Sequence, residues 1–375
     1  MNPSYLEIEA HGSPREIGRA VGEAARAFIV RGLAFYEEYH HEMGPLTFAE
    51  AERESLAYLD SARRHIPAVV EELEGMAAGA GVSLSRLLVP NLGEELTCND
   101  DPAGGASCLS HGRATADARL RSRRRPRRGH CTTVAIMAGG RRIVAHNEDW
   151  FAGDVENNVL LRLTTADGTQ ILAVTSAVLL PPTGINSHGI AGGADTVYSN
   201  DNRVGVPNNL LRRWVLEAAT LEEARDRCLL PERARGSNHL FGDAGGRIWN
   251  LETSGTAAAL VEADVWYAHA NHYLSPEMGE YDLSSSVNSR TRTARARELV
   301  QEGLARGDDP AVIAARVLAD HENGENCICG HPDENDSRGE QEMTTASMVW
   351  DLDAMSVEVA FRPPCESEHV RFAFA

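Results

Sequence analysis

Cys131 is the residue whose place in this chain is best suited to chemistry. It begins the β-rich segment CTTVAIMA and follows a long stretch rich in Gly, Ala, Asp and Arg. A cysteine is a nucleophile only as a thiolate or beside a base. If the bond between His130 and Cys131 breaks, Cys131 gains a free α-amine with a reference pKa of about 7.7–8.0, which suits a general base at neutral pH. One residue would then supply both nucleophile and base.

The same thiol offers a route for that cleavage. Attack of the Cys131 thiol on the carbonyl of His130 converts the amide to a thioester, and water then releases the new amine. Gly129 gives the backbone the freedom that this geometry needs. The structural alternative is that Cys131 is a small buried hydrophobic residue at the start of a strand, as many cysteines are.

A predicted hairpin brings a second strand back to Cys131. The Gly-Gly pair at 139–140 predicts a two-residue turn, after which RRIVAHNEDW returns along CTTVAIMA. In this register Cys131 lies opposite Glu148 and beside Asn147 and Asp149. A carboxylate there would orient the new amine. Strict register favours Glu148, whereas a bulge brings Asp149 to the thiol instead.

Three segments carry these residues. Residues 1–97 are predicted to be mainly helical, beginning with a cap at Ser13 and Pro14. Residues 98–130 have almost no large apolar side chains and predict a flexible, Arg-rich linker. Residues 131–375 alternate β-rich segments with helical segments near 208–227 and 291–306. The pattern predicts an α+β fold with mainly antiparallel sheets.

Composition excludes several kinds of protein. The net charge of −19 argues against nucleic-acid binding. The sequence contains no lysine, which excludes Schiff-base and P-loop chemistry. No apolar run approaches the roughly 20 residues of a membrane helix, and the N-terminus lacks a signal-peptide pattern. We therefore expect a cytoplasmic protein without membrane partners, whose seven cysteines are free thiols.

A metal site is the competing use for the cysteines near the C-terminus. Cys327-x-Cys329-x-His331 holds ligand types, but its spacing is tighter than the usual C-x₂₋₄-C pair and no partner pair follows in the sequence. We therefore expect neither a metal nor a cofactor, and interpret these residues as part of a loop.

From Cys131 onward the chain resembles the isopenicillin N acyltransferase (acyl-coenzyme A:6-aminopenicillanic acid acyltransferase) family of N-terminal-nucleophile hydrolases. The resemblance lies in the order of elements: CTTVAI, HNEDWF, GINSHGIAGG, GVPNNLLRR, ANHYL, CICGHPDE and SMVWDLDAMSVEV. The segments HGSPREIGRAVGE, ELEGMAAGAGVS and NLGEEL resemble the prosegment of the family. Only residues 98–130 lie outside the resemblance.

The resemblance implies a four-layer αββα fold and autocatalytic cleavage between His130 and Cys131. It also implies Cys131 as the nucleophile, Asp149 as a catalytic carboxylate and Asn271 as an oxyanion-hole donor, a role that suits a side-chain amide. A late Ser-Arg element lies near the site in the family, and Ser337-Arg338 is either that element or a loop. Asn238 and His239 are interpreted as structural. His130 departs from the small residue, such as Gly, that commonly precedes the nucleophile, which suggests a role as a proton shuttle.

Two enzymatic functions fit these residues. The first is hydrolysis of the amide bond of a small N-acyl amine through a thioester on Cys131, in an α/β heterodimer formed by self-cleavage. The second is transfer of the acyl group from coenzyme A or an amide donor to an amine. The absence of a phosphate-cradling Gly loop and of a lysine cluster favours hydrolysis, and the acidic charge suits cationic amines. A non-catalytic binding protein that is never processed is the third alternative.

Overall fold

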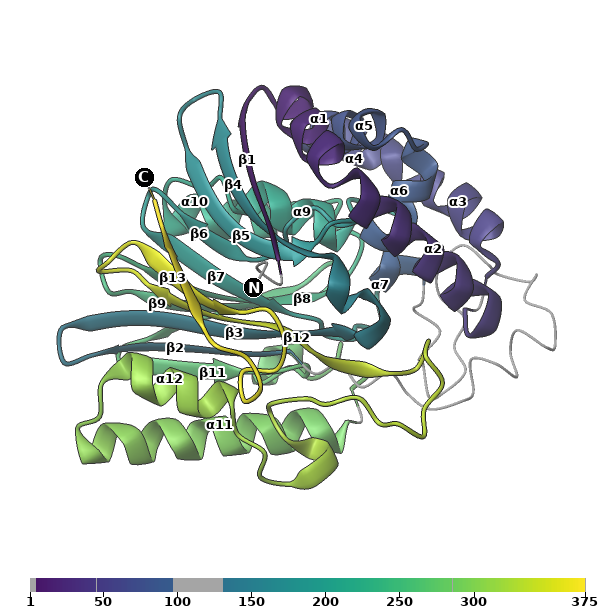
Figure 1. Ribbon diagram of the computed structural model, residues 1–375. Helices are drawn as coiled ribbons and strands as arrows, with labels where there is room; N and C mark the ends of the chain where they lie inside the picture. Colours follow the sequence, from purple (N-terminus) through teal and green to yellow (C-terminus); the bar gives the residue numbers. More distant parts are fainter. Residues whose placement is uncertain (1–4, 45, 97–130, 285, 375) are drawn as a thin grey trace.

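The computed structural model describes residues 5–44, 46–96, 131–284 and 286–374, and the following account concerns these residues. Two β-sheets lie face to face, and each carries helices on its outer face (Figure 1). The four-layer αββα arrangement expected of an N-terminal-nucleophile hydrolase fold is thereby confirmed. The predicted linker 98–130, including His130, lies outside the described residues.

The first helical layer is built mainly from the N-terminal third of the chain. Its helices and short 3₁₀ turn are α1 (Pro14–Ala24), α2 (Arg26–Glu42), α3 (Phe48–Ser55), η1 (Leu56–Tyr58), α4 (Leu59–His65), α5 (Pro67–Ala80), α6 (Leu84–Asn91) and α7 (Gly93–Leu96). Ser13 and Glu16 form the predicted capping box of α1. The α1 and α5 backbones touch, because a Cβ on Gly18 would lie only 1.8 Å from the Glu72 carbonyl oxygen.

The next layer is an eight-stranded sheet in the order β1-β4-β5-β6-β7-β8-β9-β10. Its strands are β1 (Leu6–Gly12), β4 (Asn158–Thr165), β5 (Gln170–Ser176), β6 (Gly184–Asn186), β7 (Ile190–Asp195), β8 (Ser237–Asp243), β9 (Ile248–Thr253) and β10 (Ala258–Ala263). The helices α9 (Asn208–Val215) and α10 (Leu221–Cys228) follow β7 in the chain. The 3₁₀ turn η2 (Ala152–Asn157) leads into β4.

A six-stranded sheet forms the third layer, in the order β11-β2-β3-β12-β13-β14. Its strands are β2 (Thr132–Ala138), β3 (Arg141–Phe151), β11 (Trp266–His269), β12 (Glu342–Asp351), β13 (Ser356–Ala360) and β14 (Val370–Ala373). The fourth layer consists of α11 (Val287–Arg306) and α12 (Pro310–Leu318), which lie below this sheet in Figure 1. Two 3₁₀ turns, η3 (Pro276–Met278) and η4 (Gly324–Asn326), flank these helices in sequence.

Strand alternation divides the apolar side chains among the layers. Leu160 and Leu172 point into the core between the two sheets, where they meet Trp350. Their neighbours Leu161 and Ile171 point to the opposite face and pack against the N-terminal helices. Successive residues of a strand point to opposite faces of the sheet, and here both faces are buried.

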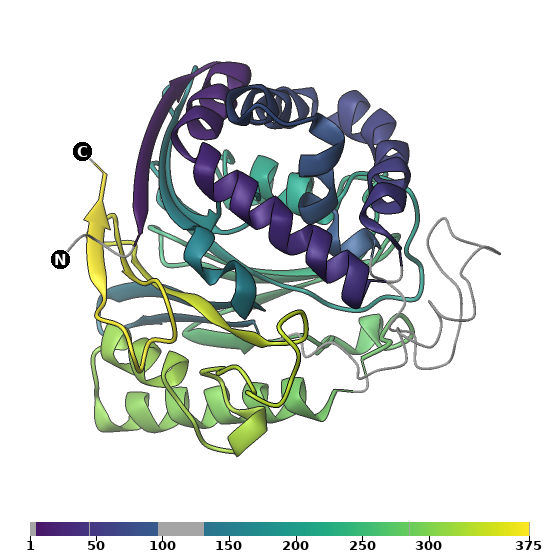
Figure 2. The same cartoon turned by 45° about the vertical axis from the view of Figure 1, so that its right-hand side comes forward.

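The N-terminal segment differs from its prediction in one respect. It is mainly helical, but β1 pairs in parallel with β4 at the edge of the eight-stranded sheet. The short apolar-polar alternation in LEIEAHG carries this strand, and the helix-rich context hides it in the sequence. The N-terminal third therefore shares both a sheet and a core with residues 131–374 rather than folding around a core of its own (Figure 2).

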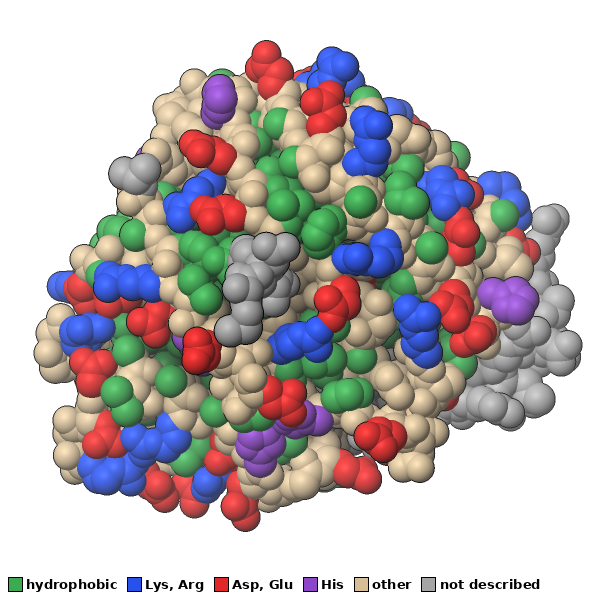
Figure 3. All heavy atoms as spheres, in the orientation of Figure 1, with side chains coloured by type: hydrophobic (Ala, Val, Ile, Leu, Met, Phe, Trp, Pro, Cys, Tyr) green, Lys and Arg blue, Asp and Glu red, His purple; other side chains and the backbone are tan. Residues whose placement is uncertain are grey.

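Charged side chains of both signs alternate with apolar ones over the face seen in Figure 3. Among the described residues, no helix is both long enough and apolar enough to cross a membrane.

Candidate active site

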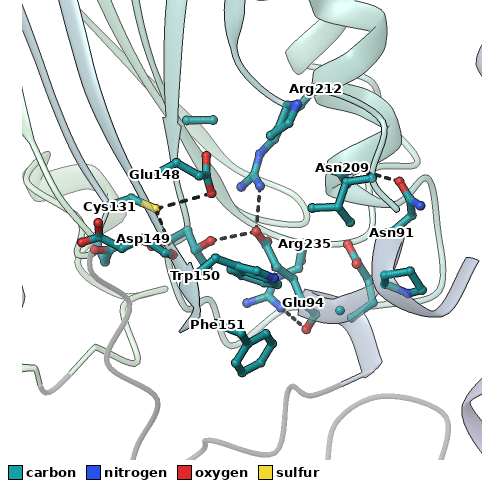
Figure 4. Close-up of a pocket in the computed structure, with 18 of the residues that line it drawn as sticks. Asn91, Glu94, Cys131, Glu148, Asp149, Trp150, Phe151, Asn209, Arg212 and Arg235 are labelled. Atoms are coloured by element: carbon teal, nitrogen blue, oxygen red, sulfur yellow. Dashed lines mark hydrogen bonds and ion pairs between the residues drawn. The ribbon is translucent and has the colours of Figure 1, made fainter. Parts of the chain in front are cut away.

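Cys131 immediately precedes β2 and is buried, with 6% of its surface exposed. The predicted hairpin is confirmed: Ala138 pairs with Arg141 across the turn, and Thr132 pairs with Asn147. This register carries the thiol to the end of β3 that bears the three consecutive polar residues of the NED sequence. Cys131 lines a pocket whose other walls come from both the N-terminal third and the rest of the chain (Figure 4).

Glu148 places a carboxylate oxygen beside the thiol. Its Oε1 atom lies 4.0 Å from Sγ of Cys131, and the backbone carbonyl of Asp149 lies 3.9 Å from the same sulfur. A register shift beside this site falls between β3 and β12, at Thr344 and Ala346, whereas β2 and β3 pair without a shift from Thr132 to Ala138. Of the two geometries that the sequence leaves open, the structure shows the strict register, with Glu148 facing Cys131.

Asp149 also lines the pocket, and its side chain is buried. Burial raises the pKa of Asp149 from 3.8 to about 7, and the lowering effects of Thr344 and Arg292 only partly oppose it. A carboxyl group with this pKa exchanges a proton near neutral pH, which is a property that catalytic carboxylates share.

The thiol itself is held in its neutral form. Burial raises the pKa of Cys131 well above its ordinary value, and the negative charges of Glu148 and Asp149 raise it further. The surrounding carboxylates thus oppose thiolate formation, and the site needs a base that removes the proton during attack.

Arg292, which the sequence analysis did not single out, ties the site together. It lies on α11 and is fully buried. Its Nη1 donates to the Cys131 carbonyl at 2.6 Å and to Oγ1 of Thr132 at 2.7 Å, while its Nη2 donates to Oδ1 of Asn271 at 2.7 Å. Nothing in the sequence distinguishes this arginine from the others of SRTRTARAR, because only the helix packing turns it toward β2.

Asn271 follows β11 and lines the same pocket. Arginine can only donate hydrogen bonds, so the contact with Arg292 fixes Oδ1 of Asn271 on that side and turns Nδ2 the other way. Nδ2 donates to the Thr196 carbonyl at 3.0 Å, and one of its two hydrogens remains for another acceptor. Ser289 holds the Asn271 backbone by accepting from its N–H at 2.8 Å.

A ladder of buried polar groups runs from Glu148 into the space between the sheets. His146 Nε2 lies 3.2 Å from Glu148 Oε2, and its Nδ1 lies 2.9 Å from Oγ1 of Thr133. Thr133 donates to Asp195 at 3.0 Å, and Asp195 accepts from Asn238 at 3.1 Å. Burial lowers the pKa of His146, but the contact with Glu148 outweighs it and the net direction is upward. The ladder holds Glu148 in place.

Three of the expected residues lie elsewhere. Asn147 points away from the pocket and donates to the carbonyls of Leu318 and Ile328, at 2.9 Å and 3.3 Å. Ser337 and Arg338 are exposed and are not among the pocket residues; Ser337 contacts Glu340, and Arg338 pairs with Glu38 at 3.5 Å. The serine and the arginine that contact the predicted residues in the described site come from α11: Ser289 accepts from the Asn271 N–H, and Arg292 donates to the Cys131 carbonyl.

The far wall of the pocket is an ion-pair cluster that joins α7 to the rest of the chain. Glu94 accepts from Arg212 at 2.7 Å, and Arg235 donates to the Glu94 carbonyl (Figure 4). Burial would raise the pKa of Glu94, but the two arginines outweigh it and hold the pKa at about 2. Glu94 therefore stays ionised and anchors the N-terminal third at the pocket.

Asp149 gives the site a testable pH dependence. Because its folded-state pKa is raised, proton binding contributes stability fully below about pH 4 and that stability is lost as the pH rises through about 7. Asp149→Asn keeps a neutral group of the same shape at every pH. The free energy of unfolding of the variant, relative to that of the parent, should therefore rise by on the order of 2–4 kcal/mol between pH 4 and pH 8. Urea unfolding of both proteins across this range, in a Cys131→Ala background that keeps one chain, measures the difference; parallel curves would contradict it.

The chain belongs to the acyl-coenzyme A:6-aminopenicillanic acid acyl-transferase family, whose profile matches residues 136–364. The resemblance that the sequence motifs carry is thereby confirmed, and the protein is an enzyme of the acyl-transferring or amide-hydrolysing kind. A relative from Emericella nidulans, the 40 kDa form of acyl-coenzyme A:6-aminopenicillanic-acid-acyltransferase, is 24% identical over 89% of this chain and 87% of its own length.

Solved structures similar to the chain include an ortholog of N-acylethanolamine-hydrolyzing acid amidase from Caenorhabditis elegans. It is 16% identical, the match covers 59% of this chain and 93% of that one, and the TM-score is 0.44. Penicillin V acylase from Agrobacterium tumefaciens is 14% identical over 62% of this chain and 82% of its own, with a TM-score of 0.43.

Proposed function

We propose that this protein cleaves itself before Cys131 and then hydrolyses the amide bond of a small N-acyl amine through a thioester on the Cys131 sulfur. One observation carries the proposal: the thiol that directly follows the 98–130 segment lies in a pocket with Glu148 4.0 Å away and with Asn271 on its wall. Arg292 donates hydrogen bonds to both the Cys131 carbonyl and the Asn271 side chain. One arginine therefore holds the nucleophilic residue and the residue proposed to donate to the oxyanion.

Self-cleavage supplies the base that the site needs. The Cys131 sulfur attacks the His130 carbonyl, the C–N bond breaks, and the nitrogen of Cys131 takes a proton to become an amine. Water then hydrolyses the thioester and leaves His130 with a new carboxylate. The freed α-amine sits two bonds from the carbon that bears the thiol, and Glu148 and Asp149 can stabilise its protonated form.

Turnover repeats the same chemistry on a substrate. The α-amine takes the thiol proton while the sulfur attacks the substrate carbonyl, and Nδ2 of Asn271 donates to the oxyanion. The ammonium returns the proton to the leaving amine as the C–N bond breaks. Water, activated by the same amine, then releases the carboxylic acid and restores the thiol.

The chain is organised for this process as a prosegment (1–97), a linker (98–130) and a catalytic chain (131–375). The contacts between the first and last parts support a stable α/β heterodimer after cleavage. Besides the β1–β4 pairing, Arg213 of α9 forms a buried ion pair with Glu72 of α5: Nη2 lies 2.8 Å from Oε2, and Nε donates to Oε1 at 3.1 Å. Such contacts do not depend on the peptide bond before Cys131.

Acyl transfer to an amine is the second candidate, favoured by the activity named in the Emericella relative. Both reactions share the acyl-enzyme and differ only in whether an amine or water reaches the thioester. The pocket lining contains five carboxyl groups and two guanidinium groups, which suits an amine-bearing substrate in either case; the carboxyl groups belong to Glu94, Glu95, Glu148, Asp149 and Glu342. Measuring free acid and new amide with an added amine acceptor distinguishes the two reactions.

The first test is the intact mass of freshly purified protein, with N-terminal sequencing of each fragment. We expect two fragments that co-purify, the larger of which begins Cys-Thr-Thr-Val. A chain that stays whole on prolonged incubation, and has no activity toward N-acyl amines, would contradict the proposal and favour a binding role. Cleavage at arginines within 121–128 alone would indicate a host protease instead.

A further inference from the structure

A cluster of cysteine and histidine side chains lies outside the pocket. It joins three segments that are far apart in sequence: His321 just after α12, Cys329 and His331 in the loop before β12, and Cys365 between β13 and β14. Each of the four residues offers one ligand atom, and all four atoms lie within 4.8 Å of one another. The tight CICGH motif thus gains its missing partners from tertiary structure.

Four separations within this cluster are close to those of a tetrahedral zinc site. For Zn–S bonds of about 2.3 Å and Zn–N bonds of about 2.0–2.1 Å, tetrahedral angles put sulfurs about 3.8 Å apart, sulfur and nitrogen about 3.5 Å apart, and nitrogens about 3.3 Å apart. The two sulfurs are 3.7 Å apart, and His331 Nε2 lies 3.8 Å from Cys329 Sγ and 3.3 Å from Cys365 Sγ. The Nε2 atoms of His321 and His331 are 3.0 Å apart.

The residues around the cluster also fit a metal site. The other ring nitrogen of His331, Nδ1, lies 3.2 Å from Glu366 Oε1. A carboxylate on the far nitrogen of a metal-binding histidine fixes its tautomer and orientation, and is a regular companion of zinc ligands. Cys327 is turned away and donates its S–H to the Cys329 carbonyl at 3.0 Å, so it is not a member of the cluster.

We propose that His321, Cys329, His331 and Cys365 bind one structural Zn²⁺ ion. Binding releases the two thiol protons to solvent, and the thiolates neutralise the charge of the ion. Two cysteines and two histidines fill all four positions, which is the pattern of a structural rather than a catalytic site. The ion would fasten the C-terminal loop and the end of α12 to the segment 327–331.

The segment 327–331, which the zinc ion would hold, contacts the strands that carry the proposed active site. Gly330, next to the ligand Cys329, exchanges hydrogen bonds with Thr344 at 2.9 Å and 3.1 Å, and the Ile328 carbonyl accepts from Asn147. Thr344 pairs with Asp149 across β3 and β12. The metal would hold the loop that covers the outer side of the Asp149 end of β3.

A disulfide between Cys329 and Cys365 is the alternative use of the two sulfurs. It gives no role to the two imidazoles that meet at the same point, nor to the carboxylate behind His331. A second group of ligand types, Cys131, His146 and Glu148, belongs to the proposed catalytic site. All measurements are therefore made in a Cys131→Ala background, so that metal bound at the nucleophile does not contribute.

The test is the metal content of the full-length protein by mass spectrometry, after gel filtration in zinc-free buffer. We expect about one zinc ion per chain, and less than about one tenth of that in Cys365→Ser and in His321→Ala. Both of these ligands are exposed residues, so their variants should fold. Cys327→Ser is the matched control, because it changes a cysteine of the same motif outside the cluster and should keep the zinc.

Two further measurements make the result independent of folding. Co²⁺ added to metal-free protein should give the visible absorption bands of a tetrahedral thiolate site, and Cys365→Ser should not give them. A chelator should lower the melting temperature of the parent but not of Cys365→Ser. The proposal is overturned by a zinc-free parent that gives no Co²⁺ bands, by unchanged zinc in both ligand variants, or by a parent mass lower by two thiol hydrogens.

Discussion

Cys131→Ala is expected to leave the chain in one piece and to abolish amide hydrolysis. The substitution removes the sulfur that would attack both the His130 carbonyl and the substrate, and no second thiol lines the pocket described by the structure. Loss of a nucleophile lowers kcat on the order of 10⁶-fold, to the level of the remaining environment. Gel electrophoresis of the purified variant shows whether the chain is cleaved. The release of carboxylic acid from an N-acyl amine measures turnover.

Cys228→Ala is the matched control for this experiment. Cys228 is fully buried among the apolar side chains of α10 and β9, away from the pocket. Its loss should lower stability by about 1 kcal/mol through the small cavity it leaves. It should leave both cleavage and turnover intact. A Cys131→Ala protein that is still cleaved between residues 130 and 131, or still turns over, would remove Cys131 from the mechanism.

The second large effect is expected at Asn271. Asn271→Ala should lower kcat by about 10²–10³-fold with a small change in KM, because the amide hydrogen acts on the oxyanion and not on the ground-state substrate. The alanine also leaves Arg292 without the acceptor that now takes its Nη2 hydrogen bond, at a cost of about 1–3 kcal/mol in stability.

Asn271→Asp separates these two consequences. It keeps an oxygen for Arg292 and so preserves the fold, but it replaces the amide donor by a carboxylate that repels an oxyanion. Its kcat should fall at least as far as that of the alanine variant. Asn186→Ala serves as the control for the loss of a buried amide, since Asn186 is not among the pocket residues: its Nδ2 donates to the carbonyls of Leu216 and Ala218, and its Oδ1 accepts from the N–H groups of His188 and Ile190. Near-normal kcat in Asn271→Asp would exclude the oxyanion role.

The sequence by itself determined the hairpin that carries the site. Because a Gly-Gly turn and a period of two fix which residues pair, the position of Glu148 opposite Cys131 followed from counting, and the structure has that register. Local patterns also placed most helices and the capping box at Ser13. The family resemblance, rather than periodicity, supplied the four-layer order and the roles expected of Asp149 and Asn271.

Only the tertiary structure decided which distant side chains meet. Arg292 reaches Cys131 because α11 packs beneath β2, and β1 joins β4 across more than 140 residues of chain. Likewise, Cys365 and His321 complete a ligand set that the spacing of CICGH had argued against. Ser337 and Arg338, which the resemblance offered as either a Ser-Arg element or a loop, are exposed on the surface. A local pattern records neighbours along the chain, whereas a site is assembled by the packing of layers, which no single segment encodes.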